Sequence, residues 1–264
     1  MKKNLFLILA GLWLLSCRNE DPAQWLKHAT WIDLSHEYDS NTVYWPTNVK
    51  FRQDTVFCGI NSQNYFYASF KYSAEEHGGT HFDAPLHFHQ GGESIEKIGM
   101  ERLHGPAVVV DVTEQASQNR DYLVGKTDLE NWEKIHGRIP DGAVILLRTG
   151  WGKFYHDHLK YTGTLKTGVE GVRELHFPGL DPQAAKWIAE NRKVVAIGID
   201  TPSIDNGQST EFLTHRILCA SGITAYENIA RLDEVPEKGA YIVAFPMKIK
   251  GGSGAPLRIA AILP

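Results

Sequence analysis

Ala107-Val108-Val109-Val110-Asp111-Val112 is a compact apolar run rich in β-branched residues, and it decides the fold class. β-Branched residues favour strands. A strand that is apolar on both faces is typical of a sheet covered on both sides. Similar apolar runs follow along the chain at residues 143–148, 193–199, 241–245 and 257–263. The sequence therefore predicts a sheet with deeply buried strands.

Signals for helix starts lie between these runs. Thr127 and Glu130 have the spacing of a capping box, which predicts a helix from 127 to about 136. Asp181 before Pro182 predicts a second helix to about 191, because Asp is a favoured cap and proline fits the first helical turn. Thr210 is expected to cap a third helix, from 210 to about 220. Strands alternating with helices indicate one α/β domain with a mixed sheet.

Two further segments have patterns of their own. Phe66, Ala68, Phe70 and Tyr72 alternate with more polar residues, and this period of two predicts a half-buried strand over 65–72. Residues 151–175 are rich in Gly, Tyr and His, and we expect them to form a long functional loop.

The first residues indicate export. Lys2 and Lys3 precede an apolar run over 5–15. That run is shorter than the roughly 20 residues that a membrane-spanning helix needs, and it fits the core of a signal peptide. Leu14-Leu15-Ser16-Cys17 resembles the bacterial lipobox, in which the cysteine receives lipid. The alternative is an ordinary signal peptide with a chance cysteine.

These features divide the chain into a signal peptide over 1–16, a polar tether over 17–24 and a domain over 25–264. We expect the protein to be anchored through Cys17 in the bacterial cell envelope, in the periplasm or at the outer membrane. For Cys58 and Cys219 we favour two buried thiols over a disulfide. The net charge is −4 and no basic stripe occurs, so nucleic acid is an unsuitable partner.

Histidines cluster in one segment, which runs His77-Gly78-Gly79-Thr80-His81-Phe82-Asp83-Ala84-Pro85-Leu86-His87. The double glycine predicts a turn, since glycine allows unusual backbone angles. His81 and Asp83 are two residues apart, so in extended chain they point to the same side. His77, folded in by the turn, would complete a set of three metal ligands. The bland alternative is a His-rich surface loop.

Imidazole and carboxylate ligands without a thiolate suit zinc, manganese or iron. Three protein ligands leave a coordination position free for water, which is typical of a catalytic site. His87 has a suitable pKa to move a proton to a leaving group. The sequence contains no His-Glu-x-x-His, Gly-x-Ser-x-Gly or phosphate-binding glycine motif. The histidine cluster is therefore the candidate catalytic site.

The pattern His-x-Gly-Thr-His-x-Asp-x-Pro-x-His resembles the signature of the metal-dependent cyclase-like hydrolases, and every specified position is filled. That family includes bacterial kynurenine formamidase and isatin hydrolase. The likeness continues in segments that span most of the chain, at residues 33–36, 43–46, 178–180, 198–205, 215–218 and 227–230.

The resemblance implies a swivelling β/β/α fold and an assembly of dimers or larger oligomers. It also implies that His77, His81 and Asp83 hold one metal. Asp83 would bridge to a second metal held by His215 and Glu227, and His87 would be the acid/base residue. Within the family, the kynurenine formamidases resemble two-zinc enzymes, whereas isatin hydrolase resembles a manganese enzyme. We therefore expect this chain to bind one or two ions of zinc or manganese.

These features predict hydrolysis of a small amide, N-formyl amide or lactam. Thr80 is a candidate donor to the oxyanion, and Tyr44, Trp45 and Phe66 are candidates to line a pocket for a flat substrate. Ordinary core packing is the equal alternative for these three aromatic residues. Two other functions stay open: a lactonase, and an envelope lipoprotein that binds a metal or metabolite without turnover.

Overall fold

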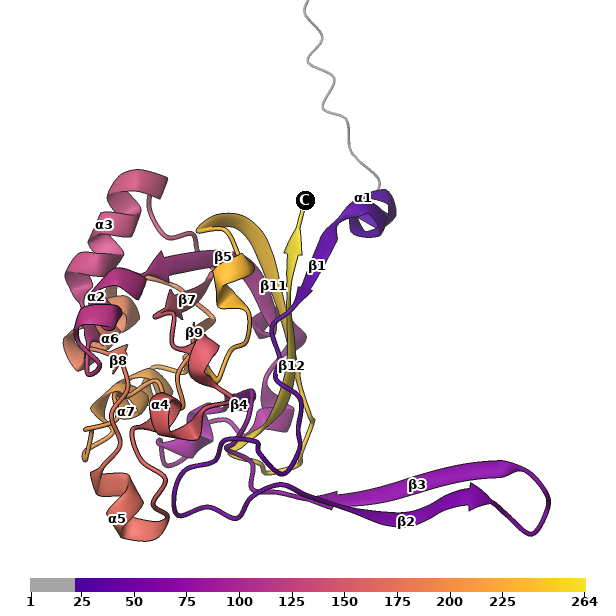
Figure 1. Cartoon of the computed structure of the whole chain (residues 1–264). Helices are drawn as coiled ribbons and strands as arrows, with labels where there is room; N and C mark the ends of the chain where they lie inside the picture. Colours follow the sequence, from indigo (N-terminus) through magenta and orange to yellow (C-terminus); the bar gives the residue numbers. More distant parts are fainter. Residues whose placement is uncertain (1–21) are drawn as a thin grey trace, which may run out of the picture.

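The computed structural model describes residues 22–264, which fold into a mixed sheet with helices on one side and a long hairpin on the other (Figure 1). The main sheet has the strand order β1-β12-β11-β5-β7-β9-β10-β4. Its strands are β1 Thr30–Asp33, β4 His81–Asp83, β5 His104–Asp111, β7 Val144–Arg148, β9 Ala196–Ile199, β10 Thr224–Glu227, β11 Lys238–Pro246 and β12 Gly254–Leu263. Strands β5, β7, β9 and β10 are parallel. The predicted α/β domain with a mixed sheet is confirmed.

Strand β4 pairs with both β10 and β12, so the sheet closes on itself into a barrel-like arrangement. The helices are α1 Pro22–His28, α2 Thr113–Gln118, α3 Lys126–His136, α4 His158–Thr162, α5 Gly168–Arg173, α6 Pro182–Asn191 and α7 Leu213–Ala220. A short parallel pair, β6 Leu123–Val124 and β8 Gly179–Leu180, lies outside the main sheet.

The parallel strands are buried on both faces, as their continuous apolar runs predict. Val108 and Val110 of β5 pack in the cluster beneath the helices, together with Leu129 of α3 and Ile188 of α6. Val109, between them, points the other way into the core enclosed by the closed sheet. This alternation fixes β5 between two apolar layers and places the polar ends of the strands at the rim of the sheet.

The three predicted helices exist, but two of them are capped differently. Asp181 caps α6 as predicted, and its carboxylate accepts the N–H of Gln183 at 2.6 Å. Helix α3 begins at Lys126, where Asp128 reaches back to the N–H of Gly125 at 2.8 Å, so the Thr127 capping box is wrong.

Helix α7 begins at Leu213, and Thr210 does not cap it. The carboxylate of Asp205 takes the cap position from outside, accepting the N–H groups of Thr214 at 3.2 Å and His215 at 3.0 Å. A carboxylate at a helix N-terminus is also favoured by the helix dipole.

Residues 151–175 are not an open loop. They form a short 3-10 helix Gly152–Phe154 followed by α4 and α5. Trp151, Tyr155 and Tyr161 pack with Val43 and Phe177 in a third apolar cluster. Residues 151–175 are therefore packed against Val43, the residue before Tyr44.

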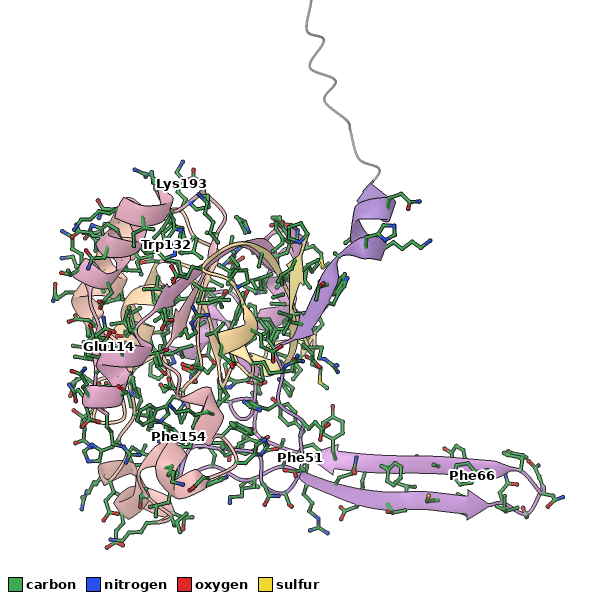
Figure 2. All side chains as sticks on the ribbon, turned by 45° about the horizontal axis from the view of Figure 1, so that its top comes forward. Phe51, Phe66, Glu114, Trp132, Phe154 and Lys193 are labelled. Atoms are coloured by element: carbon green, nitrogen blue, oxygen red, sulfur yellow. The ribbon has the colours of Figure 1, made fainter. Side chains whose placement is uncertain are left out.

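Strands β2 Arg52–Ile60 and β3 Phe66–Ser73 form a separate two-stranded hairpin, which we call the arm (residues 52–73). It projects away from the body, with Phe51 near its root and Phe66 towards its tip (Figure 2). Phe66, Phe70 and Tyr72 are 63%, 50% and 54% exposed. The predicted half-burial of this strand is thus wrong for the single chain, because no part of the body covers the arm.

Several predictions on the N-terminal segment, the signal peptide and the lipid site at Cys17, lie outside the described residues. Among residues 22–264, no helix is long and apolar enough to cross a membrane. Cys58 is exposed on the arm and Cys219 is buried, and both are free. The expected absence of a bond between them agrees with the structure, whereas the expected burial of Cys58 does not.

Candidate metal centre and pocket

The double glycine turns the chain from the arm into the site. Gly79 has a φ of 57°, a conformation that glycine adopts without strain. A Cβ on Gly78 would collide with the ring of Tyr44. The N–H of Gly79 donates to the carbonyl of Val43 at 2.8 Å, which fixes the turn against the chain beside Tyr44. Glycine is therefore required at both positions, for different reasons.

Strand β4 then places His81 and Asp83 on one side, as their spacing predicts. Because β4 pairs with β10, His81 lies directly opposite Glu227. The Nε2 atom of His81 is 3.3 Å from Asp83 Oδ1 and 3.3 Å from Glu227 Oε2. All three side chains are buried. Strand pairing thus joins residues that lie far apart in the sequence.

Helix α7 adds His215 to the same cluster. Its Nε2 atom is 3.1 Å from Glu227 Oε1 and 3.3 Å from Asp83 Oδ2. Its Nδ1 atom is 2.7 Å from Asp205 Oδ2. A carboxylate on the far nitrogen of a ligating histidine holds the ring and its tautomer. Asp205 therefore has two tasks, capping α7 and orienting His215, and the sequence patterns did not reveal either.

His77 and His87 complete the cluster on its more open side. His77 Nδ1 is 2.7 Å from Asp83 Oδ1. The ring of His87 stacks on that of His77, with centroids 3.6 Å apart and an angle of 13°. The donor atoms of His77, Asp83 and His87 lie within 4.8 Å of one another, as do those of His81, Asp83 and Glu227. Asp83 is common to both groups.

All six predicted metal and acid/base residues thus converge. The resemblance puts His77, His81 and Asp83 on one ion and leaves His87 as an acid/base group. His77 Nδ1 and His81 Nε2 both lie against Asp83 Oδ1, at 2.7 Å and 3.3 Å, and His87 lies near His77. The other oxygen of Asp83 faces His215 at 3.3 Å, so Asp83 lies between the two predicted ligand sets.

The donor set fits a divalent cation. Metal bonds of about 2.0–2.2 Å to nitrogen and oxygen place two donors on one ion about 3.0–3.5 Å apart. The spacings between His81, His215 and the two carboxylates are 3.1–3.3 Å. In the described part of the chain, no Lys or Arg forms an ion pair with Asp83 or Glu227. Buried carboxylates need a positive partner, and a metal ion would supply it.

The pKa values of His81 and Asp83 also indicate that the carboxylates need a positive partner. Burial opposes a charge on His81, but the Asp83 and Glu227 carboxylates outweigh it and raise its pKa to about 10. Burial would raise the pKa of Asp83, yet the neighbouring histidines lower it well below its ordinary value. Protonated imidazoles therefore take the place of the cation in the metal-free chain.

A cavity of about 310 Å³ opens above the cluster, and His77, His81, His87 and His215 contribute to its lining. Its apolar part includes Tyr44 and Trp45, as predicted, together with Phe88 and Phe212. Phe212 lies 5.8 Å from the Trp45 ring and 5.3 Å from the Phe88 ring. Sequence reasoning missed Phe88 and Phe212, although Phe88 directly follows His87.

Phe66 and Thr80 do not take the places predicted for them. Phe66 is on the arm, away from the cavity (Figure 2). Thr80 is fully buried, and its hydroxyl donates to the carbonyl of Asn228 at 2.7 Å and accepts the N–H of His36 at 2.8 Å. The hydroxyl proton of Thr80 is therefore used in a hydrogen bond to the backbone. Through these two bonds Thr80 holds the segment before His81 against Asn228 and His36.

Tyr44 has a free polar group where Thr80 has none. Its hydroxyl is buried and has no hydrogen-bond partner among residues 22–264. Burial, aided by the nearby Glu75 carboxylate, raises its pKa to about 12, so it keeps its proton. An unpaired buried donor in a cavity is costly unless a ligand accepts from it. Tyr44 therefore offers a hydrogen bond to a bound molecule.

His87 also lines the cavity. Burial lowers its pKa to about 3, and the carboxylate of Asp83 only partly opposes this effect. The imidazole is therefore neutral at pH 7.

Comparison with known proteins agrees with this site. The profile of a family described as "Putative cyclase" matches residues 32–206. An isatin hydrolase of Roseibium aggregatum is 32% identical, over 72% of this chain and 72% of its own length. A kynurenine formamidase of Bacillus mycoides is 28% identical, over 88% of this chain and 97% of its own.

Among solved structures, isatin hydrolase A from Ralstonia solanacearum superposes with a TM-score of 0.81 at 30% identity, covering 90% of this chain and 93% of that one. The matched family segment contains the double-glycine turn, β4 and His87. Sequence signature, fold and convergent side chains lead to one conclusion: the chain belongs to the cyclase family of metal-dependent hydrolases.

Proposed function

We propose that the chain is a metal-dependent amidohydrolase that opens a small cyclic amide or removes the formyl group of an aryl amide. The observation that carries this proposal is a buried cluster of histidines and carboxylates at the floor of an aromatic cavity. Relatives named isatin hydrolase and kynurenine formamidase support a non-peptide C–N bond as the target.

The cavity supports a flat aromatic substrate. Its volume of about 310 Å³ is at the lower end for small-molecule sites. Trp45, Phe88 and Phe212 supply apolar ring surface, and the histidines and Glu227 of the cluster supply polar atoms. A ring system between the aromatic side chains would direct its amide carbonyl towards the histidines.

The chain's own residues supply binding and proton transfer. A divalent metal, when bound, activates water and polarises a carbonyl. Neutral His87 accepts the proton that the attacking water loses and delivers it to the leaving nitrogen as the C–N bond breaks. The Tyr44 hydroxyl donates to the carbonyl oxygen as negative charge develops there. Asp205 acts indirectly, by holding the ring of His215.

The metal itself is proposed to be zinc or manganese, since the donors are imidazole and carboxylate. Two ions are favoured because one oxygen of Asp83 faces His77 and His81 and the other faces His215.

The test combines metal analysis with a substrate panel. The purified chain is loaded with zinc or manganese, its metal content is measured, and it is assayed with isatin, N-formyl aryl amides, simple lactams and the matching lactones. We expect one or two ions per chain and hydrolysis of an amide substrate. Metal uptake with hydrolysis of lactones alone would refute the amide assignment, and metal uptake with no turnover would favour a binding protein.

We also infer lipid anchoring at Cys17, which the lipobox-like sequence Leu14-Leu15-Ser16-Cys17 supports. Cells that express the chain are fed a labelled fatty acid. We expect label in the wild-type chain and none in Cys17→Ser. Equal labelling of both chains would exclude this site.

A further inference from the structure

A second cavity lies beside the cavity above the metal cluster. Its volume is about 280 Å³, close to the 310 Å³ of the first, and residues from 41–50 and 158–167 line it. Tyr44, Trp45 and Asn48 line both cavities, so these three residues form a shared wall. We call the second cavity the annex. Because its two sides lie far apart in the sequence, no local pattern predicts it.

Hydrogen bonds hold the two sides of the annex together. The N–H of Gly168, at the start of α5, donates to the carbonyl of Pro46 at 2.8 Å. On α4, His158 donates from Nε2 to the carbonyl of Asn41 at 2.9 Å. Helices α4 and α5 are thereby fixed against the chain around Trp45 (Figure 1). The annex is therefore formed before any ligand enters, as small-molecule sites usually are.

The charged residues that line the annex are basic. They are Lys50 and Lys166, with His158 beside them, and no Asp or Glu of residues 22–264 contributes to the lining. The whole chain has a net charge of −4, so this local excess of positive charge is not a general property of the protein. A cleft lined by one sign of charge concentrates ions of the opposite sign.

The two lysines differ in their partners. Lys166 is already paired with Glu174 at 2.6 Å, and Glu174 does not line the annex. Lys50 forms no ion pair with a carboxylate in the described part of the chain. Glu75, which accepts the N–H of Val49 at 2.6 Å, lines the other cavity. One unpaired ammonium group suits an anion of single charge.

The remaining lining suits a small aromatic ring. Tyr44, Trp45, Pro46 and Leu165 supply apolar surface, and Asn48 adds an amide that can donate to an oxygen atom. A carboxylate attached to an aromatic ring combines a single charge with a flat apolar body. The annex therefore matches an aryl carboxylate better than a small inorganic anion, which has no apolar part.

The proposed reaction produces a molecule of this class. When a cyclic aryl amide is opened, the oxygen of water bonds to the carbonyl carbon as the C–N bond breaks. One proton goes to the nitrogen, and the acid that forms loses another at neutral pH. The substrate is neutral and the product is an anion, so a basic site binds the product in preference to the substrate. This choice of ligand rests on the proposed function.

We propose that the annex is a second ligand site, in which Lys50 binds the carboxylate of an aryl acid released by the reaction. Tyr44 and Trp45 lie between the annex and the cavity above the metal cluster. A ligand in the annex presses on the same wall that a substrate contacts from the other side. Product that accumulates in solution therefore slows further turnover.

The binding test uses the metal-loaded chain and benzoate as the probe, measured by calorimetric titration. Benzamide, which has nearly the same shape but no charge, is the control ligand. Lys50→Gln removes the charge in the annex, Lys50→Arg keeps it, and Lys153→Gln removes the charge of an exposed lysine that does not line the annex.

We expect Lys50→Gln to raise the dissociation constant of benzoate by at least about tenfold, because a charge-assisted hydrogen bond is lost. Lys50→Arg should change it by less than about threefold, and Lys153→Gln by less than about twofold. Benzamide should bind the wild type at least about tenfold more weakly than benzoate does. Lys50 is exposed, so the variants should keep the melting temperature of the wild type.

Steady-state kinetics with an amide substrate gives the second measurement. Benzoate that binds only at the metal competes with the substrate and leaves kcat unchanged. Benzoate in the annex should lower kcat of the wild type, and this effect should disappear in Lys50→Gln. Purely competitive inhibition that is equal in both chains would contradict the feedback through the shared wall.

Equal dissociation constants of benzoate for the wild type and Lys50→Gln would overturn the annex as an anion site. So would benzamide that binds as tightly as benzoate. If no amide is hydrolysed but benzoate binding still depends on Lys50, the annex is supported as an anion site and the proposed function fails. The two ideas therefore stand or fall on separate measurements.

Discussion

The metal cluster and the arm both depart from the usual distribution of residues between core and surface, but in opposite ways. The cluster buries two carboxylates, Asp83 and Glu227, with histidines as their only charged partners among the described residues. The arm exposes aromatic residues such as Phe66 and Phe70 to water. Charge is normally outside and aromatic surface inside.

Each departure indicates a missing partner of matching chemistry. A buried carboxylate pair calls for a cation, whereas an exposed aromatic face calls for another apolar surface. Sites where the local rules fail are expected to be functional. If the two regions are separate, substitutions at the cluster should change the chemistry and substitutions on the arm should not.

The largest effect is expected at Asp83, which both ligand groups share. Asp83→Asn keeps the shape but removes the charge, so the chain should lose its metal. Loss of metal assistance removes several kcal/mol of transition-state stabilisation, or about 10⁴-fold in kcat/KM. Elemental analysis and steady-state kinetics measure both, with exposed Asp157→Asn as the control. Full activity in Asp83→Asn would remove the metal cluster from the mechanism.

His87 is the next most sensitive position. His87→Ala should keep the metal and lower kcat by about 10²- to 10³-fold, because it removes proton transfer but not the other ligands. The neighbouring exposed His89→Ala is the matched control and should retain activity. Loss of metal in His87→Ala would show instead that His87 is a ligand, which its grouping with His77 and Asp83 permits.

Metal affinity should depend on pH in a defined direction. His81 has its pKa raised from 6.5 to about 10 in the metal-free chain, with burial opposing and the carboxylates causing the rise. Its proton therefore stabilises the metal-free fold below pH 6.5, and this contribution is lost as the pH rises towards 10.

A metal must displace that proton, so the affinity should rise with pH over this window, by up to about tenfold per pH unit for each displaced proton. Calorimetric titration in buffers of different ionisation enthalpy counts the protons released. A pH-independent dissociation constant with no proton release would contradict the protonated state of His81.

The smallest effect separates the two regions directly. Trp45→Ala should raise KM by about tenfold, because it removes a wall of the cavity. Phe66→Ala, on the arm, should leave KM unchanged, because Phe66 does not line the cavity. Both are measured by steady-state kinetics on one substrate. A raised KM in Phe66→Ala alone would place the arm, rather than Trp45, at the substrate.

The sequence predicted what depends on neighbouring residues. Asp181 caps the helix beside it, and His81 and Asp83 share a side because extended chain repeats every two residues. The alternation over 65–72 correctly predicted a strand but wrongly predicted its half-burial, because Phe66, Phe70 and Tyr72 lie exposed on the arm. A period of two gives the strand and its two faces, but it does not say whether another part of the chain covers either face.

What escaped prediction depends on contacts between distant segments. Asp205 caps α7 and holds His215 from outside the helix, so no local pattern records it. Glu227 meets His81 only because β10 pairs with β4. Without the family resemblance, neither His215 nor Glu227 stands out from an ordinary core histidine or surface carboxylate.

The double pairing of β4 has a consequence for stability. The three residues of β4 close the sheet, and two of them, His81 and Asp83, carry donor atoms that could hold a metal ion. An ion held by these residues together with Glu227 and His215 would tie the closing strand to β10 and α7. A ligand present at a thousand times its dissociation constant adds about 4.1 kcal/mol to the unfolding free energy. Removing the metal with a chelator should therefore lower the melting temperature and accelerate amide exchange first in β4. The resistance of the chain to unfolding would then measure how much metal it holds.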